Sequence, residues 1–102
     1  MQSKYAELGQ AASVDEVVDV TRDYLASWSR EELECLPDSC RPAWVNEPGD
    51  IELWADRLMV HGGKTRMYLE DELKLDRLTS HFLIASVRIR QLAGTRLHLV
   101  RN

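Results

Sequence analysis

The stretch from Arg66 to Ala93 constrains the fold more than any other part of the chain, because it reads as one long helix with two apolar faces. On one face, apolar side chains recur at steps of three or four residues, with one step of eight. They are Met67, Leu75, Leu78, Phe82, Ala85, Ile89 and Leu92. A second face, roughly opposite, carries Leu69, Leu73, Leu83, Ile84 and Val87.

A helix over 66–93 would be about 40 Å long at 1.5 Å per residue. A compact domain of 102 residues has a radius of gyration of only about 13 Å. One short chain has too little material to cover both faces of so long a rod. The second face therefore predicts self-association, as a homodimer, or a contact with another protein.

Two shorter helices precede the long one. Ser13 and Glu16 have the spacing of a capping box and open a helix whose apolar stripe reaches Trp28. Ser29 and Glu32 have the same spacing, which predicts that the helix kinks or restarts there. A proline-rich loop follows over 37–49, and Asp50 is placed to cap a helix over 51–60.

We therefore predict an all-α fold, a small bundle of three to four helices with a long C-terminal helix and a proline-rich loop between the first two. Residues 1–12 show no period and are predicted to be a loose lead-in, and 13–94 form one helical domain. Gly94 is expected to end the long helix, and 95–102 alternate like an extended tail. The predicted core is Val14, Val17, Val18, Tyr24, Leu25, Trp28, Trp54, Leu58, Leu78, Phe82, Ala85 and Ile89.

Charge is unevenly spread along the chain. The net charge is −4, with −7 in residues 1–50 and +3 in residues 51–102, and no acidic residue follows Asp76. The basic half can pack beside the acidic half, or it can form a surface for an anionic ligand or a nucleic acid. The candidates for such a surface are Arg77, His81, Arg88, Arg90 and Arg96. Nucleic-acid binding is disfavoured, because the acids of 70–76 would lie beside the phosphates.

No motif for metal, nucleotide or catalytic chemistry stands out. Cys35, Cys40, His61 and His81 are zinc-ligand types, but the cysteine spacing is not that of a zinc knuckle. Gly63-Lys64-Thr65 lacks the glycine that a phosphate loop needs five residues earlier. We therefore expect no metal, no cofactor and no enzymatic activity, and the sequence leaves open whether the two cysteines have a redox role.

Cellular placement follows from what the sequence lacks. No apolar run approaches the roughly 20 residues that span a membrane, and residues 1–12 do not have the pattern of a secretory signal. We expect a cytoplasmic protein of bacterial type with reduced thiols. The preferred function is a non-enzymatic protein–protein interaction module that self-associates through the long helix. The alternative is a small regulator that binds an anion or nucleic acid through the arginine stripe.

Overall fold

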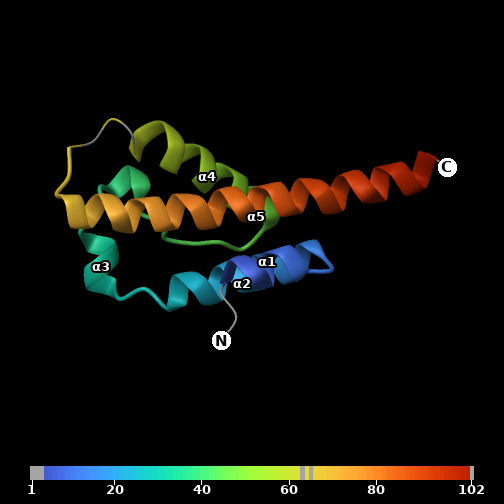
Figure 1. The fold of residues 1–102 in the computed structure, drawn as a ribbon, viewed down its shortest axis with the longest axis horizontal. Helices are drawn as coiled ribbons and strands as arrows, with labels where there is room; N and C mark the ends of the chain where they lie inside the picture. Colours follow the sequence, from blue (N-terminus) through green and yellow to red (C-terminus); the bar gives the residue numbers. More distant parts are fainter. Residues whose placement is uncertain (1–3, 63, 65, 102) are drawn as a thin grey trace.

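The computed structural model is an all-α bundle built around its last helix (Figure 1). It describes the backbone of residues 4–62, 64 and 66–101, and the side chains of residues 5–62, 64 and 66–94. Over these residues the elements are α1 (Lys4–Gln10), α2 (Val14–Ala26), α3 (Arg30–Glu34), the 3₁₀ helix η1 (Asp38–Cys40), α4 (Pro48–Gly62) and α5 (Leu69–Arg101). The predicted fold class is confirmed.

Helix α5 is the axis of the molecule. It contacts α1, α2 and α4, so most of the chain packs along its sides. Figure 1 shows α4 on one side of α5, α1 and α2 on the other, and the C-terminal end of α5 extending past them all. The bundle is accordingly elongated, with extents of 51 × 30 × 21 Å and a radius of gyration of 14.4 Å.

The two ends of the chain differ from the sequence expectation. Within the predicted loose lead-in, α1 is helical and is held by tertiary contacts: Leu8 and Ala11 are buried in the core. At the other end α5 does not stop at Gly94 but continues to Arg101, where an extended tail was expected. One glycine inside a helix costs only about 1 kcal/mol, and the leucines and arginines that follow it are good helix formers.

The core joins the inner side of α5 to every neighbouring helix. Phe82 and Leu78 are fully buried at its centre. Nine predicted core residues are buried, while Val14, Tyr24 and Leu25 are only partly buried against them. The core also holds buried residues outside the predicted core list, namely Leu8, Ala11, Leu36, Cys40, Val45, Ile51, Ala55 and Leu75. Two of these, Cys40 and Val45, come from the proline-rich loop, which lies against α4 and contributes to the core.

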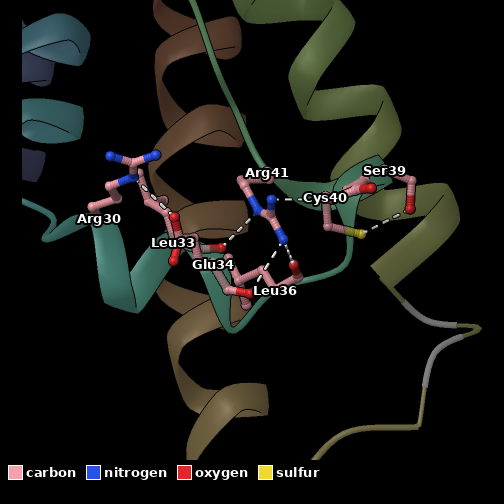
Figure 2. Close-up of polar contacts among 8 residues, drawn as sticks. Arg30, Leu33, Glu34, Leu36, Ser39, Cys40 and Arg41 are labelled. Atoms are coloured by element: carbon pink, nitrogen blue, oxygen red, sulfur yellow. Dashed lines mark hydrogen bonds and ion pairs between the residues drawn. The ribbon is translucent and has the colours of Figure 1, made fainter.

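A single arginine fixes the start of that loop (Figure 2). The guanidinium group of Arg41 donates from Nε to the carbonyl of Leu33 at 2.9 Å, and from Nη2 to the carbonyls of Glu34 at 3.2 Å and Leu36 at 2.6 Å. It also pairs with Asp38 at 3.0 Å. The last carbonyls of a helix lack intrahelical partners. Arg41 therefore ends α3 and turns the chain into η1.

The predicted helix starts are largely reproduced. Ser13 is the N-cap of α2 and its hydroxyl accepts from the amide of Glu16, while Ser29 and Glu32 form a complete capping box at α3. Asp50 differs from its predicted role, because α4 begins earlier, at Pro48. Proline is well suited to the first helical position. Asp50 instead lies in the first turn, where its carboxylate accepts from the amides of Asn46 and Glu47.

The capping box at α3 gives a pH-dependent expectation. The amide of Ser29 donates to the Glu32 carboxylate at 3.0 Å, which together with the Ser29 hydroxyl holds the pKa of Glu32 below its ordinary value. A lowered pKa in the folded state stabilises the fold above the unfolded-state value, and the gain is lost as the pH falls through the folded value. We expect Glu32→Gln to melt at a lower temperature than the wild type at pH 7, with the difference shrinking below about pH 4. Thermal melts followed by circular dichroism across this range test it, and a difference that does not change with pH would contradict it.

Candidate functional site

The side of α5 that faces away from the core is the first candidate site. Four of the five predicted interface residues are exposed there: Leu69 is 73% exposed, Leu73 57%, Ile84 37% and Val87 50%. The fifth, Leu83, is half-buried and packs against the core. Asp76 and Ser80 lie on the same exposed side, between the two apolar pairs. We call this surface, from Leu69 to Val87, the outer face of α5.

Two hollows lie on the outer face, where α1 runs beside α5. The first has a volume of about 510 Å³ and is lined by Tyr5 of α1 together with Leu73, Arg77 and Ser80. The second, of about 270 Å³, is lined by Gly9 of α1 together with Leu83, Ile84 and Val87. Sequence reasoning missed Tyr5 and Gly9, because seven helical residues show too little periodicity to reveal a helix. The three-residue spacing of Tyr5 and Leu8 was the available signal.

The predicted anion-binding residues do not form one surface. His81 is fully buried: its ring stacks on Tyr24 at 4.0 Å between centroids, and its Nε2 shares a hydrogen bond with the Thr21 hydroxyl at 3.1 Å. The same packing raises the pKa of Tyr24 through burial. Arg77 is exposed, and its guanidinium carbon lies 5.0 Å from the ring centroid of Trp28. His81 thus holds α2 against α5 rather than facing solvent.

The remaining arginines of that set are separated by the elements around them. Arg88 donates from Nε and Nη2 to the carbonyl of Ala11, at 3.1 and 2.6 Å, and so fastens the end of α1 to α5. Arg90 points to the other side of α5 and pairs with Glu52 of α4 at 3.3 Å. The side chain of Arg96 lies outside the described residues. The described arginines of the stripe therefore face different neighbours.

The cysteines and histidines are also kept apart. Cys35 is exposed and Cys40 is buried, and both thiols are free. In the part of the chain that the structure describes, no three histidine, cysteine or acidic side chains gather in a way that could hold a metal ion. A cleft of about 580 Å³ beside Cys35 is lined by Pro37, Arg66 and Tyr68 among others. It brings one thiol, one arginine and the carboxylate of Asp71 to the surface.

Comparison with known proteins leaves the outer face of α5 to be interpreted on its own geometry. No family model, no curated protein and no solved structure matches the chain. Among the described helices, none combines the length and the apolar character needed to cross a membrane. The exposed apolar residues of α5 and the two hollows beside α1 are the features that bear on function.

Proposed function

We propose that this chain is a non-enzymatic interaction module that self-associates through the outer face of α5. The observation that carries the proposal is the exposure of Leu69, Leu73, Ile84 and Val87 along one side of a single helix. Scattered apolar residues are normal on a protein surface, but apolar residues gathered on one helix face, as in the two pairs at the ends of the outer face, mark an interaction site. The two hollows beside α1 make this surface concave in two places, where side chains of a partner would insert.

The stripe also belongs to an element that cannot easily move away. Helix α5 is fixed by Phe82 and Leu78 on its inner side, and Arg88 binds it to α1. Its outer side is therefore presented in one orientation, without a segment having to be ordered when a partner binds. A preorganised surface loses less entropy on association than a mobile one.

Light scattering after size exclusion tests the proposal. At two concentrations tenfold apart, we expect the wild type to have twice the chain mass of 11.7 kDa. Leu73→Asp combined with Val87→Asp should weaken the dimer by about 100-fold or more, because a symmetric dimer would bury each charge twice. The double variant should then elute at the mass of one chain.

Val60→Asp is the matched control. Val60 is an exposed apolar residue like Val87, but it lies on the side of α4 opposite to the buried Ile51, Trp54 and Leu58. This variant should keep the dimeric mass. A wild type that stays monomeric at the higher concentration would refute self-association, and so would a dimer that survives Leu73→Asp with Val87→Asp.

A further inference from the structure

The outer face of α5 has an internal pattern that bears on how two copies would pair. Its central residues follow each other at steps of four and three, which is the seven-residue repeat of paired helices. They are Leu69, Leu73, Asp76, Ser80, Leu83 and Val87, and we call them the seam. The seam is apolar at both ends and polar in the middle.

The polar middle distinguishes the two possible directions of pairing. If two α5 helices ran parallel, each seam residue would face its own copy, and Asp76 would face Asp76. Two carboxylates brought together at a partly dehydrated interface repel each other strongly. If the helices ran antiparallel about a two-fold axis near residue 78, Asp76 would face Ser80 of the second copy. The serine hydroxyl could then donate a hydrogen bond to the carboxylate.

The same antiparallel register matches the apolar ends. Counting outward from residue 78, Leu73 faces Leu83 of the second copy and Leu69 faces Val87. Every apolar seam residue therefore meets an apolar one. The hollow beside Gly9 lies at Leu83 and Val87, and an added Cβ at Gly9 would meet nothing within 4 Å, so α1 leaves room there for the incoming leucines.

The helix dipoles favour the same direction. Antiparallel pairing opposes the dipoles of the two α5 helices, whereas parallel pairing aligns them.

We propose that the second copy docks antiparallel on the outer face, with Leu69 of each chain against Val87 of the other. This inference rests on the proposed self-association and adds its direction and register. It assigns the seam to a partner of defined chemistry, a second copy of this chain whose seam is apolar at both ends and polar in the middle.

Cysteine cross-linking tests the direction. In a Cys35→Ser background, which removes the exposed thiol, three variants are compared: Leu69→Cys, Val87→Cys and the two together. A disulfide needs Cα atoms within about 7 Å. In the antiparallel dimer, residue 69 lies about 27 Å along the axis from residue 69 of the second copy. Under mild oxidation, the double variant should give a covalent dimer on a non-reducing gel, and the single variants should stay monomeric.

The outcomes separate the two proposals. Light scattering of the reduced wild type reports on self-association alone, so a monomer there refutes the proposed function and this inference together. A dimeric wild type whose single variants cross-link as well as the double variant would overturn the antiparallel direction. Absence of cross-links in a dimeric double variant would overturn the register.

A second pair of positions guards against a weakened dimer. If Leu69→Cys with Val87→Cys lowers the reduced mass to one chain, Asp76→Cys with Ser80→Cys replaces it, because both positions are exposed. The antiparallel register again requires the double variant to form a covalent dimer more readily than either single variant. Equal cross-linking by the single variant Asp76→Cys would overturn it.

Discussion

Phe82→Ala lowers the free energy of unfolding by about 3–5 kcal/mol, the range for removing a large aromatic ring from a well-packed core. Phe82 is fully buried on the inner side of α5, and its ring packs edge-on against His81 at 5.9 Å between centroids. Several helices meet around it, so the structure cannot collapse into the space without moving them. The total free energy of unfolding of a small domain is only about 5–15 kcal/mol, so this substitution removes a large share of it.

Urea denaturation followed by circular dichroism measures this effect. Val60→Ala is the control, because Val60 of α4 is an exposed apolar residue outside the outer face of α5; this substitution should change the free energy of unfolding by less than about 1 kcal/mol. All variants are compared at one chain concentration, since association with a partner adds to apparent stability. A Phe82→Ala loss no larger than that of Val60→Ala would show that the core is not organised around the inner side of α5.

Arg41→Met is expected to cost about 2–3 kcal/mol, because hydrogen bonds made by a charged group contribute about 1.5–3 kcal/mol and this arginine is only partly buried. The substitution keeps the side-chain stem but removes the donors to the carbonyls of Leu33, Glu34 and Leu36. The end of α3 and the start of η1 then lose the side chain that binds both of them. Cys40, which is buried next to Arg41, therefore becomes exposed more readily.

Arg30→Met is the matched control for Arg41→Met. Arg30 pairs with Glu34 at 2.9 Å, but its side chain is 91% exposed, so its loss should cost no more than about 0.5 kcal/mol. The rate at which a thiol reagent modifies Cys40 in a Cys35→Ser background gives a second, local readout. Equal stabilities of the two methionine variants would mean that Arg41 does not hold the turn.

The parts of the fold that were predictable from sequence are those decided by neighbours along the chain. Ser13 and Ser29 start helices because each hydroxyl accepts from an amide three residues on, a local interaction that spacing reveals. Helix α1 could not be found in this way. Its seven residues are too few for a stable isolated helix, and Leu8 reveals its partner only once α5 is in place.

For the outer face of α5, the helical period places side chains around the axis but does not say which neighbours lie there. The exposure of Leu69, Leu73 and Val87 was predictable, because these residues lie opposite the inner apolar stripe. The burial of His81 was not, since it depends on Thr21 of α2, sixty residues earlier. The contact of Arg88 with Ala11 could not be predicted either, because Arg88 donates to a backbone carbonyl seventy-seven residues away and no local sequence pattern indicates that carbonyl.

Helix α5 follows α1, α2 and α4 in the chain, and this order decides when the core can form during synthesis. A ribosome adds about 5–20 residues per second and releases the N-terminal part first. Helices α1, α2 and α4 all pack on α5, so they emerge before the surface that they share exists. Their apolar sides therefore stay uncovered for seconds in the nascent chain, until α5 has been synthesised. Any premature stop before Ile89 would therefore yield a product without a complete core, which quality-control proteases should remove.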